Sequence, residues 1–473
     1  MTEDKIDKEN PEMQGPTDYY SSTDLLSAIG FKADPGDIYY LEPPIPLTSY
    51  KMYIDNPQKK DKALIGSYIS YTMSGTDISD KLNRRYSEFY SLYEKLLQRW
   101  PGVYIPKVPH KILINNKDTV NVKIRMRLLN RFCLNLSKID YLYKSEEVNI
   151  FKNNIPEVTN AIEKLPNLTY GEILARMKEA FPNANESYDI ILGKSKINEF
   201  DQFLKKTLKN LEIFRSSVIS AMAKKEVEKN KYLDLVKGFS EYEKLNMMSY
   251  ADNSESKLIF FNPSYSNLSE KVMKLNTQMI NPYSVFKDWL DEDILDCEAM
   301  IEAIKRINQM IETVEKLKRH RDSLDLDIKQ LESGQSGFLK SIKSIFKKKE
   351  VQLSEKSTEM NLTIQKIDDL EKIINIVSWQ MEERIEEYKK EKTYSYYKYL
   401  KTFAILQRES NKIIRELWKL VKEALNDVCP EIIKGFGGEE EKLSGPVSDY
   451  IKQTQELEKP EESEPQQTDE PTE

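Results

Sequence analysis

Apolar residues recur along the chain with two different periods, and the change of period divides it into two halves. In the first half, residues 49–54 and 67–73 alternate apolar and polar positions, which predicts half-buried strands. The stretch between them is expected to be a turn, and residues 83–86 a third strand. Helices over about 87–99 and 124–137 complete a predicted α+β domain.

The second half is predicted to be helical throughout. Apolar residues recur there at spacings of three and four, which is typical of long bundle or coiled-coil helices of roughly 50–80 residues. Breaks are expected near 249–266 and 333–338. Pro282 is expected to bend the second helix, although prolines also occur simply at helix starts. A hairpin with one apolar stripe on each helix usually needs a second copy to bury that stripe, so we expect a dimer.

A short segment between the halves predicts an amphipathic helix over 170–181. Thr169 and Glu172 have the spacing of a capping box, and Pro182 ends the segment. The apolar positions form one stripe that includes Ile173, Leu174, Met177 and Phe181. Such a helix either inserts into a membrane interface or packs against one of its neighbouring domains.

The distribution of charge along the chain is more informative than the net charge of −7. Residues 48–155 contain 19 Lys/Arg and 10 Asp/Glu, a balance of +9, between acidic ends at 1–37 and 436–473. A basic domain of this kind favours an anionic partner, either phospholipid or nucleic acid. No run approaches the ~18 apolar residues of a membrane span, and the start does not resemble a signal peptide, so we expect a soluble intracellular protein.

Candidate chemistry is sparse. Three scattered cysteines and two histidines rule out a disulfide framework and argue against a zinc site. The sequence has no Gly-rich phosphate loop, no Gly-x-Ser-x-Gly and no His-Glu-x-x-His. We therefore expect no catalytic residue, no metal, no cofactor and no enzymatic activity.

The strongest local pattern is Arg84-Arg85-Tyr86-Ser87-Glu88-Phe89, followed by a proline loop from Pro106 to Lys111 and then by Arg125. In order and spacing this resembles the phox-homology (PX) domain of the sorting nexins, over about residues 45–155. The resemblance implies binding of phosphatidylinositol 3-phosphate. Nucleic acid is the competing anion, but the basic residues lack the interleaved stacking aromatics of a known module, so we expect no nucleic-acid partner.

The resemblance assigns a role to each matched residue. Arg85 would hold the 3-phosphate with its planar fork of donors, and the ring of Tyr86 would stack under the inositol. Lys111 would meet the 1-phosphate, and Arg125 would bond the 4- and 5-hydroxyls. Lys107 replaces a proline that is usual in the family, and is expected to add a positive charge close to the membrane.

The helical half resembles, more generically, the BAR domain of the PX-BAR sorting nexins. In those proteins a membrane-inserting helix lies between the two domains, which suggests membrane contact by Ile173, Leu174, Met177 and Phe181. A basic stretch near the second break would lie at the tip of a BAR-like hairpin and touch anionic lipid, unless it is simply a solvated loop. Its lysines are Lys340, Lys343, Lys347, Lys348 and Lys349.

The predicted domains are a disordered acidic segment (1–36), a PX domain (37–155), a linker with the amphipathic helix (156–186), a BAR domain (187–430) and a disordered acidic tail (431–473). The resemblance implies a cytoplasmic protein, peripheral on early endosomes, that forms a homodimer or a heterodimer with another PX-BAR sorting nexin. It would sense or induce curvature for cargo retrieval, with retromer as a candidate partner. The alternative is a PX-anchored coiled-coil scaffold that does not remodel membranes.

Overall fold

The computed structural model describes residues 50–62, 66–78, 80–111, 118–184, 190–247, 274, 279, 281–332 and 343–428. The chain divides into two compact units. The first comprises residues 1–224 and 281–407, and the second comprises 225–280 and 408–473. The expected acidic ends and both expected helix breaks lie largely outside the described residues.

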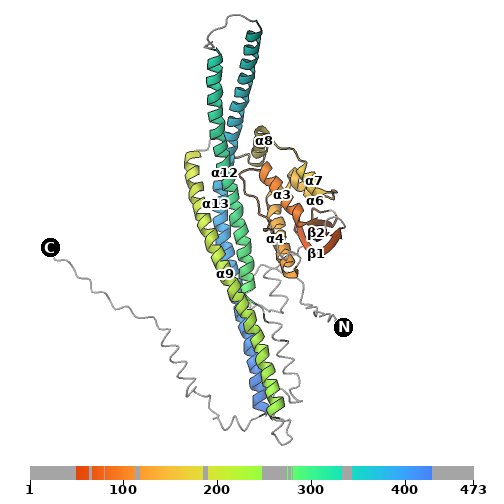
Figure 1. Ribbon diagram of the computed structural model, residues 1–473. Coiled ribbons are helices and arrows are strands. Elements are labelled where there is room, and N and C mark those ends of the chain that lie inside the picture. Colours follow the sequence, from red (N-terminus) through yellow and green to blue (C-terminus); the bar gives the residue numbers. More distant parts are fainter. Residues whose placement is uncertain are drawn as a thin grey trace, which may run out of the picture. The chain divides into compact units, whose positions relative to one another are not determined.

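A three-stranded antiparallel sheet begins the first unit, in the order β1-β2-β3 (Figure 1). The strands are β1 (Tyr53–Lys62), β2 (Gly66–Ser74) and β3 (Leu82–Arg85). The prediction of three strands is confirmed, but the expected turn after residue 54 is wrong, because β1 continues to Lys62 across a register shift between Asp55 and Gln58. The irregularity absorbs Asn56, whose φ is 44°, a conformation that Asn tolerates better than most residues.

Five helices of 4 to 20 residues follow the sheet: α3 (Tyr86–Arg99), α4 (Thr119–Lys138), α5 (Asp140–Tyr143), α6 (Glu146–Lys152) and α7 (Val158–Glu163). Helix α3 buries the face that its spacing predicts, which includes Phe89, Leu92 and Leu96. Asp118 caps the start of α4: its carboxylate accepts hydrogen bonds from the backbone N–H groups of Val120 and Asn121.

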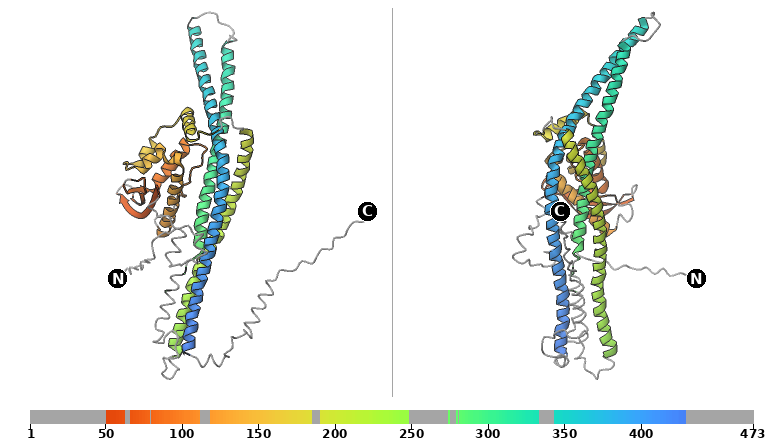
Figure 2. Two further views of the ribbon diagram at one scale, coloured as in Figure 1. Left: turned by 180° about the vertical axis from the view of Figure 1, so that it is seen from behind. Right: turned by 90° about the vertical axis from the view of Figure 1, so that its left-hand side faces the viewer.

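Longer helices follow α8 (Tyr170–Ala180): α9 (Ile190–Tyr242), a π-helical turn η2 (Glu243–Met247), α12 (Tyr283–Glu332) and α13 (Lys343–Val428). Helices α12 and α13 run side by side and antiparallel (Figure 2), with Lys318 paired to Glu371 and Lys356 to Asp327. Pro282 precedes the first residue of α12. The expectation of a bend inside that helix is therefore wrong, since proline there ends a turn and fits a helix start.

The three strands and helices α3–α7 form what we term the sheet domain. One contiguous core joins this sheet domain, α8 and the long helices within the first unit. Gly102 lies in close contact with the long helices: its φ is +83°, and a Cβ built there would lie 2.9 Å from Met310 and 3.1 Å from Val377. Any larger residue would be strained in backbone and packing alike. In the second unit, the ring of Tyr232 on α9 packs edge-on against Trp418 on α13, with centroids 6.5 Å apart.

Candidate functional site

Two neighbouring arginines at the end of β3 have opposite environments, because successive strand residues point to opposite faces. Arg84 is buried, and its guanidinium donates to the carbonyls of Phe151 and Asn153 at 2.7 to 3.0 Å. The side chain of Arg85 is 34% exposed. Arg84 therefore holds the fold together, and Arg85 is the arginine that a ligand can reach.

Arg85 is fixed through its backbone more than through its side chain. Its N–H donates to the carboxylate of Glu88 at 2.8 Å, which is the capping interaction of α3. Its guanidinium lies 6.0 Å from the ring of Tyr68 and 4.0 Å from the carboxylate of Glu88. Both contacts are long, so the guanidinium can turn toward an incoming anion without breaking the cap.

Tyr86 links three parts of the sheet domain. Its hydroxyl donates to the carbonyl of Pro109 at 2.7 Å, and the guanidinium of Arg125 lies 5.4 Å from its ring. Burial raises the pKa of Tyr86 although Arg125 lowers it, so the hydroxyl stays a neutral donor. These two contacts hold the first residue of α3, the proline loop and helix α4 together.

Lys111 follows this loop and is exposed, with no ion pair to any residue that the structure describes. Lys107 differs from the expectation. Its ammonium lies 3.3 Å from the carboxylate of Glu298 on α12, so its charge is neutralised inside the molecule and does not add to a membrane-facing surface.

A hollow of about 460 Å³ lies beside Arg85 on the side of Tyr68, and sequence reasoning missed it. Three carboxylates and two cations contribute to its lining: Glu88, Glu157, Glu163, Lys60 and Arg85. The three carboxylates in its lining disfavour an anion inside this hollow.

A second charged face of the sheet domain, also missed from the sequence, packs on α12. Arg127 is largely buried and pairs with Asp288, Asp291 and Glu292 at 2.8 to 3.2 Å. Arg131 pairs with Glu292 at 3.4 Å. Because the acidic partners lie more than 150 residues away in sequence, no local pattern marked this face.

Helix α8 forms with the predicted capping box: Thr169 Oγ1 accepts from the N–H of Glu172, whose carboxylate accepts from the N–H of Thr169. Its four proposed membrane-contact residues are at most 8% exposed and belong to the core: Ile173, Leu174, Met177 and Phe181. The structure thus shows the packed alternative. Contact of these side chains with lipid requires α8 to leave the core.

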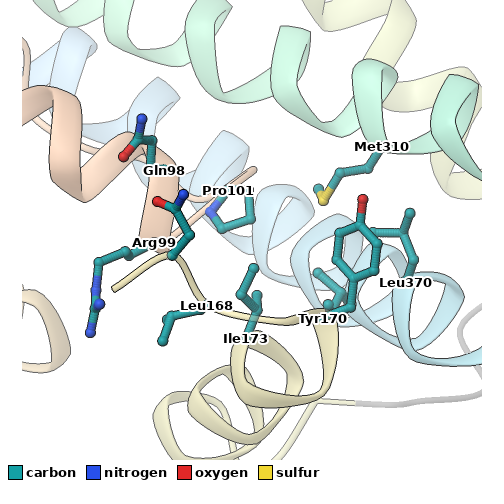
Figure 3. A pocket seen from close by; sticks show the side chains of 10 residues that line it. Gln98, Arg99, Pro101, Leu168, Tyr170, Ile173, Met310 and Leu370 are labelled. Atoms are coloured by element: carbon teal, nitrogen blue, oxygen red, sulfur yellow. The ribbon is translucent and has the colours of Figure 1, made fainter. Parts of the chain in front are cut away.

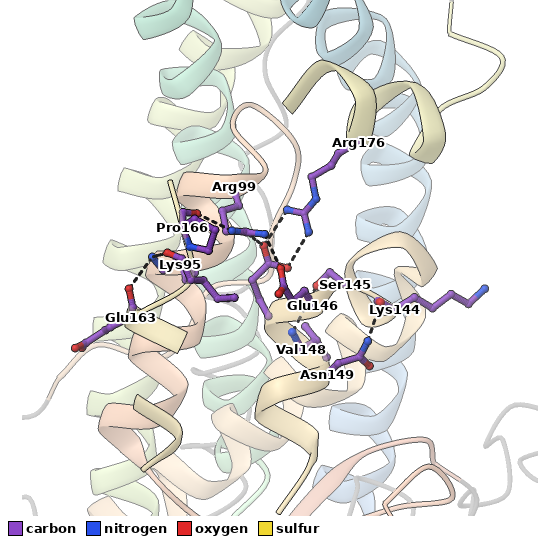
Figure 4. A network of polar contacts seen from close by, with 12 residues as sticks. Lys95, Arg99, Lys144, Ser145, Glu146, Val148, Asn149, Glu163, Pro166 and Arg176 are labelled. Carbon is purple, nitrogen blue, oxygen red and sulfur yellow. Dashed lines mark hydrogen bonds and ion pairs between the residues drawn. The ribbon is translucent and has the colours of Figure 1, made fainter. Parts of the chain in front are cut away.

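A buried carboxylate anchors α8. Glu147 on α6 is fully buried and forms ion pairs with Arg99 of α3 and Arg176 of α8. Figure 4 shows Arg99 and Arg176 within one network of polar contacts. Burial alone would raise the pKa of Glu147, but hydrogen bonds from Arg176 and the two positive charges outweigh it and hold the pKa below its ordinary value. The guanidinium of Arg176 also lies 4.7 Å from the ring of Trp100.

A second hollow, of about 360 Å³, lies where α3 ends and α8 begins, against α12 and α13 (Figure 3). It is lined chiefly by apolar side chains, among them Pro101, Tyr170, Ile173, Met310 and Leu370. This hollow is a gap between packed elements. Its lining has no set of polar side chains directed at one point that would bind a ligand.

The side chains of the basic stretch near the second helix break fall outside the described part of the chain. Lys340 is outside the described residues, and the side chains of Lys343 and Lys347–Lys349 at the start of α13 are not described. Within the described part of the chain, no helix is long and apolar enough to cross a membrane, and no cluster of three or more His, Cys, Asp or Glu could hold a metal ion.

Comparison with known proteins gives matches to both the sheet domain and the longer chain. A family model described as the PX domain matches residues 73–154. Sorting nexin-4 of Eremothecium gossypii is 24% identical over 280 residues, which cover 54% of this chain. The match spans 65% of that relative, just under two thirds of its length.

Among solved structures, the cryo-EM structure of the SNX-BAR Mvp1 tetramer is similar over 78% of this chain and 99% of its own, with 18% identity and a TM-score of 0.48. The PX match, the sorting nexin relative and the long helices that follow the sheet domain support a PX-BAR sorting nexin.

Proposed function

We propose that the chain is a non-catalytic peripheral membrane protein that binds phosphatidylinositol 3-phosphate through Arg85, Tyr86, Lys111 and Arg125. The carrying observation is the contact of Tyr86 with both Arg125 and Pro109. It joins residues 39 positions apart in sequence (125 − 86) beside the loop that ends in Lys111. Such convergence is what a shared ligand requires.

Each side chain offers a suitable chemistry. Arg85 provides a planar donor fork for the two oxygens of the 3-phosphate. The buried Arg125, held against the ring of Tyr86, would donate to the 4- and 5-hydroxyls and leave no room for phosphates there. Lys111, exposed at the end of the loop, supplies a point charge for the 1-phosphate.

The test is replacement of Arg85 by Ala in the full chain, with Lys144→Ala as the control. Lys144 directly follows α5, is 74% exposed and, among the described residues, forms an ion pair with Asp140 alone. Co-sedimentation with liposomes of singly and multiply phosphorylated inositides should show selective binding of the 3-phosphate by the wild type and the control. Arg85→Ala should lose it at least tenfold, about 1.4 kcal/mol. Unchanged affinity in Arg85→Ala would overturn the assignment.

We also propose that the long helices form a dimer, with a second copy or with another PX-BAR sorting nexin. In the first unit, α9 and α13 expose large apolar side chains that are each at least 39% exposed: Phe203, Ile213, Phe214, Tyr397 and Leu400. Apolar surface of this extent on long helices is typical of an association face. Light scattering after size exclusion should give twice the 55.4 kDa chain mass, and Ile213→Glu with Tyr397→Glu should give the single mass.

The dimer would sense or induce curvature on early endosomes during cargo retrieval, with retromer as a candidate partner. Two inositide sites in one dimer raise avidity without any new contact. Electron microscopy of liposomes separates this from the scaffold alternative: tubules that disappear with the dimer-disrupting pair support remodelling, whereas binding without tubules supports the scaffold.

A further inference from the structure

The proline loop is held from two sides. On the side of the sheet domain, Tyr86 binds the carbonyl of Pro109 at 2.7 Å. On the side of α12, a single carboxylate receives the two polar residues that flank Pro109: Glu298 lies 3.3 Å from the ammonium of Lys107 and 3.0 Å from Nε2 of His110. Lys111 is the next residue.

The segment that contains the loop, residues 103–110, alternates between buried apolar side chains and polar side chains that contact α12. Val103, Ile105 and Val108 are at most 3% exposed and enter the core. The polar residues between them face α12, where Tyr104 also donates to Asp296. Proline fixes φ at residues 106 and 109, so few backbone torsions are left to vary once both sides are held.

We infer that Glu298 is a positioning residue of the phosphoinositide site: from the helical region, it clamps residues 107–110 so that Lys111 is presented to the headgroup. The inference rests on the proposed function. Its distinctive claim is that a residue 187 positions beyond Lys111 (298 − 111), on a helix that does not touch the ligand, sets the affinity of the sheet domain.

The environment of Glu298 suits this role. Its side chain is 17% exposed, so its ion pairs are better protected from solvent than those on an open surface. Burial would raise the pKa of Glu298, but the hydrogen bond from His110 and the charge of Lys107 outweigh it, so the carboxylate stays ionised at neutral pH. Its loss would both loosen the loop and release the charge of Lys107.

These two consequences have opposite effects on two kinds of binding. A loosened loop presents Lys111 less often in the right place, so specific binding of the headgroup weakens. A released ammonium adds positive charge, so non-specific attraction to anionic membranes strengthens. A general loss of folding would weaken both, which makes the pair of measurements diagnostic.

The experiment uses the full chain with Glu298→Ala and Glu298→Gln, the second of which keeps hydrogen-bonding capacity without the charge. Glu302→Ala is the matched control, because Glu302 lies one turn along α12 and its ion pairs to described residues are with Lys305 and Arg306 of its own helix. The probes are soluble short-chain phosphatidylinositol 3-phosphate in calorimetry, and phosphatidylserine vesicles without inositide in co-sedimentation.

Glu298→Ala should bind the soluble inositide about fivefold more weakly, which is about 1 kcal/mol at 1.4 kcal/mol per tenfold. The Gln variant should lie between it and the wild type, and the control should match the wild type. Binding to phosphatidylserine vesicles should rise in Glu298→Ala. Adding Lys111→Ala should cost less affinity in the Glu298→Ala background than in the wild type, since Glu298 acts through Lys111.

Additive losses, or equal inositide affinity in wild type and Glu298→Ala, would overturn the inference while leaving the proposed function intact. A wild-type chain that shows no preference for the 3-phosphate, or an Arg85→Ala chain that keeps it, would instead overturn the proposed function, and the inference with it.

Discussion

Two faces of the same helix use arginine in opposite ways. Arg125 of α4 lies against Tyr86 on what we term the inositide face (Arg85, Tyr86, Lys111 and Arg125). Arg127, two residues further, points to the docking face, defined as the side chains that meet α12 (Tyr104, Lys107, His110, Arg127 and Arg131). Residues two apart on a helix point nearly opposite ways, so the separation follows directly from the helix period.

The comparison shows that the basic side chains of the sheet domain fall into two groups with different roles. Three of its cationic side chains (Lys107, Arg127 and Arg131) and the imidazole of His110 meet carboxylates of α12 and contribute to the fold. On the inositide face, the guanidinium of Arg85 lies 4.0 Å from the carboxylate of Glu88, and that of Arg125 lies against the ring of Tyr86. A net charge of +9 therefore overstates the positive potential that a membrane meets.

Breaking the docking face should have the largest effect on stability. Arg127→Ala removes one guanidinium from three carboxylates, two of which are less than a fifth exposed. Leaving buried carboxylates with fewer partners costs about 3 kcal/mol in the free energy of unfolding. Urea unfolding monitored by fluorescence measures this loss.

The control for that prediction is Arg131→Ala, because Arg131 is 44% exposed and makes one longer ion pair. It should cost less than about 1 kcal/mol. Equal costs for the two variants would contradict the distinction between a buried and a peripheral pair. In folded protein, neither variant should change the preference for the 3-phosphate.

Lowering the pH should have the next largest effect on stability, because it protonates the carboxylates of α12 that contact the docking face. Asp291, Asp296 and Glu298 have pKa values below their ordinary ones: burial opposes this, but Lys287, Lys392 and His110 respectively outweigh it. Groups with a lowered folded-state pKa stabilise the fold above the unfolded value and lose that contribution as pH falls through the folded value. Urea midpoints should therefore fall as pH drops below about 4.5.

Two neighbours act in the opposite sense and limit the size of this effect. Burial raises the pKa of Asp288 and Asp293, so their protonation as pH falls relieves a cost and offsets part of the loss. The Glu298→Gln variant removes one of the three stabilising titrations. Its midpoint should vary less steeply with pH than that of the wild type, and an equal slope would show that Glu298 contributes nothing.

The sequence predicts local features of this molecule well and distant ones poorly. The three strands, the buried face of α3 and the capping box of Thr169 each depend on residues within a few positions of one another. The environments of Lys107 and Pro282 depend on features that no local pattern contains. Lys107 meets a carboxylate 191 residues away (298 − 107), and Pro282 precedes a helix whose start no local period defines.

The smallest effect is expected from holding α8 in place. Gly171 on α8 faces Asp369 of α13, whose carboxylate would lie 3.5 Å from an added Cβ. Cysteines introduced at both positions and joined by a short cross-linker would keep Ile173 and Met177 in the core. Since these side chains are already buried and Arg176 is paired with Glu147, the linked chain should bind inositides and form tubules as the unlinked chain does.

The same experiment decides whether α8 belongs with the inositide face or with the docking face. Insertion of α8 would have to expose several apolar side chains, at about 1.5–3 kcal/mol each, before the bilayer covers them again, and would separate Arg176 from a fully buried carboxylate. If the cross-linked chain keeps its inositide affinity but draws no tubules, with tubulation restored by cleaving the linker, α8 acts as a membrane wedge. Equal tubulation places α8 with the docking face, as part of the structure that holds the inositide site against the long helices.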